Sequence, residues 1–149
     1  MTVTSQIGGV QFVVFSINSQ LYSLSIEEVV EILRVPSITS VPGISEVIEG
    51  VINLRGSIIP VVNMHKRFNL PLPTKHKKNR VVIVQGDNEN IGLMVEEVSM
   101  VTKFDEDDVE PMPGQALEED MFLGFAKNEG QVIGVLNLNK VLYDHHDLS

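Results

Sequence analysis

Residues 50–63 read GVINLRGSIIPVVN, two apolar runs separated by a glycine turn with one arginine beside it. The β-branched residues in both runs favour extended backbone, and Gly50 and Gly56 supply positions where a positive φ costs little. The pattern therefore predicts a β-hairpin, with Gly50 and Gly56 as its structural turn residues. Arg55 is exposed by default at such a turn, and its partial burial would require a carboxylate partner.

The chain contains a weak internal repeat. Residues 13–29 match residues 82–98, 69 positions later, and residues 50–63 match residues 124–137, 74 positions later. Two blocks that recur in the same order at nearly the same offset indicate two similar halves. Prolines and charges interrupt the apolar pattern in residues 69–79, so we expect the boundary between the halves there.

Short strands and frequent turns make up the rest of each half. Further strands are expected at residues 11–17, 21–24, 81–84 and 91–95. Brief helices are expected at residues 44–49 and 140–143, the second capped by Asn139. Ser25 and Glu28 have capping-box spacing, and we expect a helical turn there that gives way to a strand. This pattern excludes a helical bundle and predicts an all-β fold, mainly β with short helices.

Composition restricts the partners and the environment. The chain has 149 residues, of which 43% are apolar, which is enough for one globular domain. A net charge of −9 argues against nucleic acid and against an anionic membrane, because both would repel the protein. No apolar run approaches the roughly 20 residues of a membrane span, and the sequence has neither cysteine nor a secretory signal. We therefore expect a cytoplasmic protein without direct membrane insertion.

The sequence lacks the patterns that would predict a metal, a cofactor or a catalytic residue. The acidic residues 105–110 have neither the central glycine nor the bidentate glutamate of a calcium loop, so a solvated loop is expected. The four histidines have no spacing that would let them converge on a metal. No Walker-type, dinucleotide-binding or Gly-x-Ser-x-Gly pattern is present.

The order of residues 50–63 resembles the signature of the CheW family, adaptor proteins that couple bacterial chemoreceptors to the histidine kinase CheA. Residues 26–34 (IEEVVEILR) and 41–44 (VPGI) also resemble the family, in the family's order, so the resemblance covers nearly the whole chain. It implies two linked five-stranded Src-homology-3-like β-barrels, in agreement with the repeat.

The resemblance and the repeat together predict the domain organisation. We expect a single CheW-like domain over residues 1–149. Its first subdomain would cover approximately residues 11–70, closed in part by the C-terminal residues 137–149. The second subdomain would cover approximately residues 80–136.

The resemblance also implies the function. It predicts a scaffold without catalytic activity, monomeric when free, that joins the cytoplasmic tip of chemoreceptors to the regulatory domain of CheA at the inner face of the membrane. The positions that match the family's receptor-binding region are Ile26, Val29, Glu31, Arg55 and Val98. An ion pair between Glu31 and Arg55 is favoured over a plain surface arginine, whereas the three apolar residues line the groove between the barrels or are ordinary core residues. Kinase-binding residues are not assigned.

One departure from the family leaves alternatives open. Where the family commonly has aspartate, leucine and arginine, this chain has Asn63-Met64-His65, so a salt bridge usual there is expected to be missing. The departure fits a paralogue that serves a twitching-motility or other chemosensory-like pathway. A CheV-type chain is not expected, because no phosphoacceptor domain follows Tyr143. An alternative from another class is a small-molecule-binding β-barrel module, with polar residues converging in the crevice between the halves.

Overall fold

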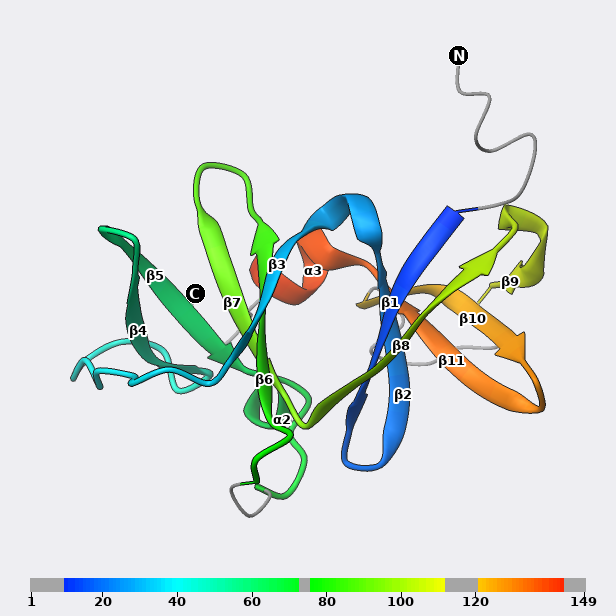
Figure 1. The fold of residues 1–149 in the computed structure, drawn as a ribbon. Coiled ribbons are helices and arrows are strands. Elements are labelled where there is room, and N and C mark those ends of the chain that lie inside the picture. Colours follow the sequence, from blue (N-terminus) through cyan, green and yellow to red (C-terminus); the bar gives the residue numbers. More distant parts are fainter. Residues whose placement is uncertain (1–9, 73–75, 112–120, 144–149) are drawn as a thin grey trace.

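In the computed structural model, residues 10–72, 76–111 and 121–143 are described, and two curled β-sheets lie side by side (Figure 1). The first sheet has six strands in the order β8 (Glu97–Phe104), β1 (Val10–Ile17), β2 (Gln20–Ser25), β11 (Gln131–Leu136), β10 (Phe122–Asn128) and β9 (Val109–Glu110). The second has five in the order β3 (Val29–Arg34), β6 (Arg80–Gln85), β7 (Asn90–Val95), β5 (Ser57–Asn63) and β4 (Ile48–Leu54). The expected fold of two Src-homology-3-like barrels is confirmed, with β9 as an additional short strand in one of them.

Two of the expected helical segments are present. The 3₁₀ turn η1 (Ile26–Glu28) connects β2 to β3, and the Ser25 hydroxyl accepts a hydrogen bond from the Glu27 N–H at 3.3 Å, so the expected turn before a strand is confirmed. The C-terminal helix α3 (Leu138–Tyr143) begins earlier than expected, because Asn137, not Asn139, accepts a hydrogen bond from the Lys140 N–H at 3.4 Å.

The other helical expectations are corrected. Residues 44–49 form no helix, because turns lead into β4 at Ile48 and the Val47 carbonyl accepts a hydrogen bond from the Asn63 N–H at 2.7 Å. A short helix, α2 (Met64–Arg67), follows β5 instead, and a second 3₁₀ turn, η2 (Glu106–Asp108), precedes β9. The Asn63 side chain begins α2 by accepting hydrogen bonds from two backbone N–H groups.

The two halves of the repeat are equivalent element by element. The elements β1, β2, β3, β4, β5 and α2 correspond in order and pairing to β6, β7, β8, β10, β11 and α3. In each half the last strand pairs in parallel with the second strand of the other half, β5 with β7 and β11 with β2. Gly50 and Gly124 both adjoin a register shift, and a Cβ on either would collide with a backbone carbonyl, that of Thr39 or Glu110. Gly50 is therefore a residue of β4 at a bulge and not a turn residue.

Each barrel combines strands from both halves. Residues 10–25 pair with residues 97–136 in one barrel, and residues 29–95 form the other. The sheets therefore do not follow the expected boundaries at residues 11–70 and 80–136. A sequence repeat identifies equivalent segments, but it does not tell which copy of a strand pairs with which.

The C-terminal helix reaches from one barrel to the other. The helix α3 follows β11, and its Tyr143 hydroxyl accepts a hydrogen bond at 2.9 Å from the N–H of Asp87, in the turn between β6 and β7. The expected closing segment, residues 137–149, extends beyond Tyr143 into residues that lie outside the described part of the chain.

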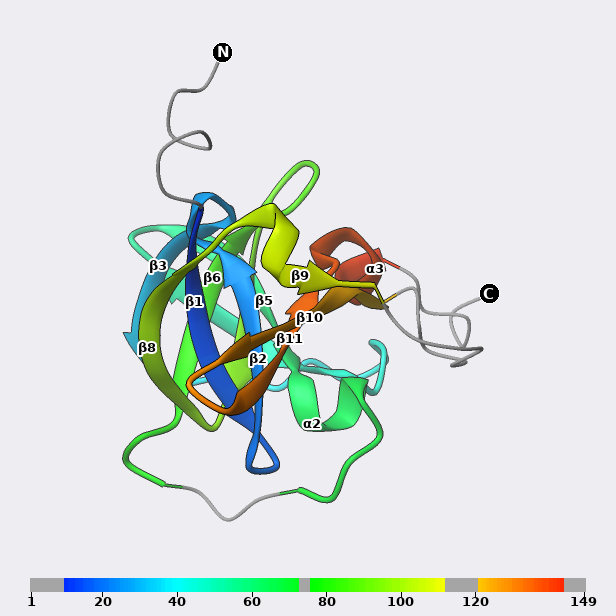
Figure 2. The same cartoon turned by 90° about the vertical axis from the view of Figure 1, so that its right-hand side faces the viewer.

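The largest apolar core lies between the barrels. Its fully buried members come from both sheets and from α2 and α3, and include Phe15, Leu24, Met64, Val84, Leu93 and Leu136. Each barrel also has a smaller core of its own, and the view along the line of the barrels shows the strands of one curled in front of the other (Figure 2). Full burial of a large apolar side chain stabilises by roughly 1.5–3 kcal/mol. Because the shared core is the largest, we expect the two barrels to unfold as one unit.

Candidate partner-binding site

An ion pair joins the two edges of the five-stranded sheet. Glu31 lies on the edge strand β3, and Arg55 lies in the turn that joins β5 to the opposite edge strand, β4. The Arg55 Nη2 nevertheless contacts the Glu31 Oε1, which requires the sheet to curl until its edges meet. The Arg55 side chain remains 68% exposed and that of Glu31 27% exposed. The expected Glu31–Arg55 pair is therefore present, on a surface that a partner could reach.

The turn that presents Arg55 is sharply constrained. Arg55 has a φ of 52° and Gly56 a φ of 89°, so both central residues of this two-residue hairpin turn are left-handed. The Gly56 N–H donates a hydrogen bond to the Asn53 Oδ1 at 3.1 Å. Glu129 (φ 53°) and Gly130 (φ 84°) form the equivalent turn of the second repeat. Gly56 is thus a turn residue, as expected.

Val29 and Val98 occupy equivalent positions in the two halves. Each lies at the beginning of its edge strand, Val29 opposite Val84 on β6 and Val98 opposite Phe15 on β1. Both are half-buried and pack against the core shared by the barrels. The structure thus gives each a core role and leaves part of each accessible.

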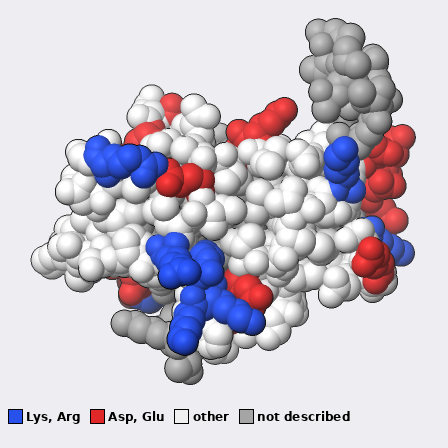
Figure 3. Space-filling view, viewed as in Figure 1, with Lys and Arg blue, Asp and Glu red and all other residues white. Residues whose placement is uncertain are grey.

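The strands β3 and β8 form one partner-accessible surface, which we call the β3–β8 face. Both views place these strands on the same side of the molecule, at the junction of the barrels (Figures 1 and 2). Their outward side chains are exposed and consist of Val30, Ile32, Arg34, Ser99, Val101 and Lys103. Ile26, on η1 next to β3, is also 39% exposed. The surface between the barrels is largely uncharged (Figure 3).

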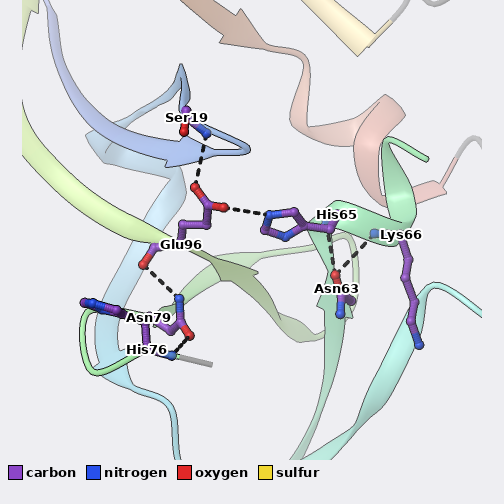
Figure 4. A network of polar contacts seen from close by, with 7 residues as sticks. All are labelled: Ser19, Asn63, His65, Lys66, His76, Asn79 and Glu96. Carbon is purple, nitrogen blue, oxygen red and sulfur yellow. Dashed lines mark hydrogen bonds and ion pairs between the residues drawn. The ribbon is translucent and has the colours of Figure 1, made fainter. Parts of the chain in front are cut away.

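A polar network centred on Glu96 joins the barrels close to this face (Figure 4). Glu96 lies between β7 and β8, and its carboxylate accepts hydrogen bonds from the Ser19 N–H at 3.2 Å and interacts with the His65 Nε2 at 3.1 Å. Its backbone N–H donates to the Ser16 carbonyl at 3.0 Å, and its carbonyl accepts from the Asn79 side chain at 3.0 Å. One residue thereby connects the β1–β2 hairpin of one barrel to α2 and to the start of β6 in the other.

The network includes His65, from the departure at Asn63-Met64-His65. The His65 side chain is only 5% exposed and points to Glu96, so this chain has a histidine–carboxylate contact at the departure. Burial alone would raise the pKa of Glu96, but the hydrogen bonds from Ser19 and His65 and the electrostatic effect of His65 lower that pKa below its ordinary value. Asn63 caps α2 and donates to the Glu49 Oε1 at 3.1 Å.

Two cavities lie at equivalent mouths of the barrels. One, of about 680 Å³, is lined by residues of the 29–95 barrel, including Asn63, His65, Lys66, His76 and Asn79. The other, of about 470 Å³, is lined by the other barrel and by η1, and has Glu27, Glu28 and Asp105 beside apolar residues. Burial raises the pKa of Glu28, a hydrogen bond from the Ser25 N–H opposes this rise, and the neighbouring charge of Glu27 adds to it.

The sequence reasoning missed the network of Glu96, His65 and Ser19. The available signal was indirect: Glu96 falls inside the repeat, opposite Glu27, and His65 stands where the family commonly has arginine. Among the described residues no three His, Cys, Asp or Glu side chains are grouped so that they could hold a metal ion, and none of the described helices is long and apolar enough to cross a membrane.

Two curled barrels that share a core and exchange strands define the class: this is a CheW-like domain, and the family model of that description matches residues 11–146. The chemotaxis protein CheW of Bacillus subtilis is 31% identical over 137 residues, which cover 90% of this chain and 87% of that protein. The CheW of Treponema pallidum is 31% identical over 107 residues, 69% of this chain and 63% of that protein. The crystal structure of the scaffolding protein TtCheW from Thermoanaerobacter tengcongensis superposes with a TM-score of 0.85 at 37% identity, covering 91% of this chain and 93% of that one.

The chain therefore belongs to the CheW family of chemotaxis scaffold proteins.

Proposed function

We propose that this protein is an adaptor that couples the cytoplasmic tip of chemoreceptors to the histidine kinase CheA and has no catalysis of its own. The observation that carries the proposal is the Glu31–Arg55 pair, which holds two charged groups beside exposed apolar residues of β3. An exposed ion pair of this kind contributes little to stability, about 0–1 kcal/mol, so its presence in the motif is better explained by a partner.

The receptor tip would be a helical hairpin bound along the β3–β8 face. A helix presents side chains at i, i+3, i+4 and i+7, and an apolar strip suits such a partner. Val30 on β3 and Val101 on β8 are each 49% exposed and supply that strip, with Val29 and Val98 half-buried beneath it. Ile26 would extend the strip at the end nearest η1.

The kinase contact would use other surfaces. The strands β4 and β9 end their sheets. Apart from the Val51 N–H and carbonyl, which bond to Thr39, these edges offer unpaired backbone groups to a similar barrel in the regulatory domain of CheA. Such a contact can be weak alone, because many linked copies in an array raise the effective concentration. The protein would then be cytoplasmic and held at the inner face of the membrane by the receptors. A paralogue in a twitching-motility or other chemosensory-like pathway would use the same surfaces.

The small-molecule alternative is less well supported by the geometry. It requires polar groups converging in the crevice between the barrels, whereas the cavity richest in polar residues lies at the mouth of one barrel. Several polar groups there already bind one another: His65 contacts Glu96, and Asn63 and Lys66 both contact Glu49, at 3.1 and 3.7 Å.

The test is co-sedimentation of the purified protein with receptor-containing membranes and a CheA-type kinase. We expect Arg55→Ala and Glu31→Ala to lose receptor binding while remaining folded. Glu129→Ala is the matched control, because Glu129 is the equivalent turn residue of the other repeat and has the same left-handed backbone. The double variant Glu31→Arg with Arg55→Glu separates the pair itself from the individual charges. Equal binding by Arg55→Ala and Glu129→Ala, or no binding by the native protein to several receptors, would refute the proposed site or the proposed function respectively.

A further inference from the structure

The two ends of the β3–β8 face carry opposite charge. Arg34 and Lys103 are equivalent residues at the ends of β3 and β8, so the repeat alone would make the two ends alike. Lys77, Lys78 and Arg80 join Arg34 at its end, and these four are four of the eleven Lys and Arg in a chain of net charge −9. Lysine and arginine side chains gather there, below the junction of the barrels (Figure 3).

The opposite end of the face is acidic. Beyond Lys103 the chain continues through Phe104 to the exposed residues Asp105, Asp107 and Asp108. The Asp108 carboxylate accepts a hydrogen bond from the Asp105 N–H at 3.1 Å, which keeps this turn compact. Acidic side chains gather at this far end of the molecule, on the side of β9 (Figure 3).

Folding accounts for the basic cluster only in part. Arg34 lies directly opposite Arg80 in the β3–β6 register, and like charges in that position are destabilising. The Arg80 Nη1 donates to the carbonyls of Lys77 and Asn79, both at 2.8 Å, which draws the cations together. In the described part of the chain no carboxylate forms an ion pair with either arginine, and Lys78 meets Glu97 only at 4.0 Å.

We infer that this charge difference orients the helical partner. The acidic end of the bound helix lies on Arg34, Lys77 and Arg80, and its other end points toward β9. The inference rests on the proposed function for the identity of the partner, but the surface chemistry is that of any amphipathic helix with acidic residues at one end. An apolar strip between two nearly equivalent strands would accept a helix in either direction. Four cations at one end and carboxylates at the other make one direction favourable and the reverse repulsive.

The first test measures affinity for a soluble helical-hairpin fragment of a chemoreceptor tip. The variant Arg34→Glu with Lys77→Glu reverses two exposed charges of the cluster, and Lys127→Glu with Lys140→Glu, on β10 and α3, makes the same change in net charge outside the β3–β8 face. We expect the first pair to weaken binding by about tenfold or more at low salt and the control pair by less than about threefold, since rim charges act mainly through complementary fields. Both effects should shrink as salt screens exposed charges. Equal weakening by the two pairs, or none, would overturn the inference while leaving receptor binding by the native protein intact.

The second test measures direction and does not depend on the receptor. The chain has no cysteine, so a spin label can be placed at Ser37→Cys, close to the basic end, or at Gln11→Cys, which lies opposite Lys103. The probe is a synthetic amphipathic helix with glutamates at one end, and its twin carries lysines there. We expect the label at position 37, and not that at position 11, to broaden the NMR signals of the peptide's glutamate end. The lysine twin should bind in reverse or not at all. The same result for both peptides, or broadening independent of the label position, would overturn the inference even if no receptor binds.

Discussion

Removal of the Glu96 side chain should loosen the joint between the barrels. In Glu96→Ala the Ser19 N–H loses its acceptor but is exposed and can bond to water, so this loss costs little. His65 is only 5% exposed and would be left without its partner, and an unsatisfied buried polar group costs about 1–3 kcal/mol. The hydrogen bonds lost are those made to the charged Glu96 carboxylate, and they add to this cost. We therefore expect a total loss of about 2–3 kcal/mol in the free energy of unfolding.

Thermal and urea unfolding measure this loss. For a domain of this size each kcal/mol lowers the Tm by about 2–4 °C, so Glu96→Ala should melt about 5–10 °C below the native protein. The matched control is Glu97→Ala, because the neighbouring Glu97 is 46% exposed and meets Lys78 only at 4.0 Å. That control should change the free energy by less than about 0.5 kcal/mol. A double-mutant cycle with His65→Ala should show coupling, since the two side chains are in contact.

The pH dependence of the same difference gives an independent check. Because the pKa of Glu96 is lowered in the folded protein, its ionised form stabilises the fold at every pH above its ordinary, unfolded value. That stabilisation is lost as the pH falls from the ordinary carboxyl range, about 4, through the lowered folded value. The stability gap between the native protein and Glu96→Ala should therefore be constant near neutrality and narrow below about pH 4. The assigned role would be refuted if Glu96→Ala and Glu97→Ala lost equal stability relative to the native protein at pH 7. It would also be refuted if the stability difference between the native protein and Glu96→Ala widened on acidification.

Three further changes test other parts of the fold. Gly124→Ala should cost about 3 kcal/mol in the free energy of unfolding, because its Cβ would collide with the Glu110 carbonyl. Gly130→Ala, in open space at a φ of 84°, should cost about 1–2 kcal/mol. A urea titration that ranks the two variants otherwise would contradict the bulge geometry. Arg67→Ala removes two donors to carbonyls at the C-terminal end of α3, at 2.8 and 3.0 Å. We expect a loss of about 2 kcal/mol in the free energy of unfolding and faster amide exchange in that helix. Unchanged amide exchange would disprove this role. Glu28→Gln should raise stability at neutral pH by less than about 1 kcal/mol and have no effect at pH 3. The raised pKa of Glu28 makes its ionised form unfavourable in the fold, and that penalty appears only as the pH rises. The same stability difference between variant and native protein at both pH values would argue against this role.

Local features of the fold were predictable where a residue's own chemistry decides the backbone. Gly56 follows Arg55 at a turn that only left-handed residues can close, and Ser25 offers a hydroxyl to the first N–H of η1. The failure at residues 44–49 has the opposite cause, because the Val47 carbonyl is claimed by Asn63, a residue on another strand that no local pattern reveals. Long-range pairing overrode local helix propensity there.

The site was predictable in part. Position in the motif placed Glu31 and Arg55, and their contact depends on the curl of a five-stranded sheet, which the resemblance implied and spacing could not supply. The Glu96 network could not be anticipated, because Glu96 is 31 positions from His65 and 77 positions from Ser19 in the sequence. These residues meet at a junction of the barrels that the repeat leaves undefined. The charge difference along the β3–β8 face was hidden for the same reason: the register that sets Arg34 against Arg80 appears only in the folded sheet.

The exchange of strands connects the joint between the barrels to the proposed partner surface. The chain passes from one sheet to the other at η1 and again at Glu96, and each passage leads directly into a strand of the β3–β8 face, β3 in one case and β8 in the other. A helix bound along that face therefore contacts both strands immediately after the points where the relative position of the barrels is fixed. Because packed cores have discrete arrangements and resist continuous deformation, a partner that holds β3 and β8 together stabilises one arrangement of the barrels. Binding at the face and rigidity at the Glu96 network should for this reason reinforce one another.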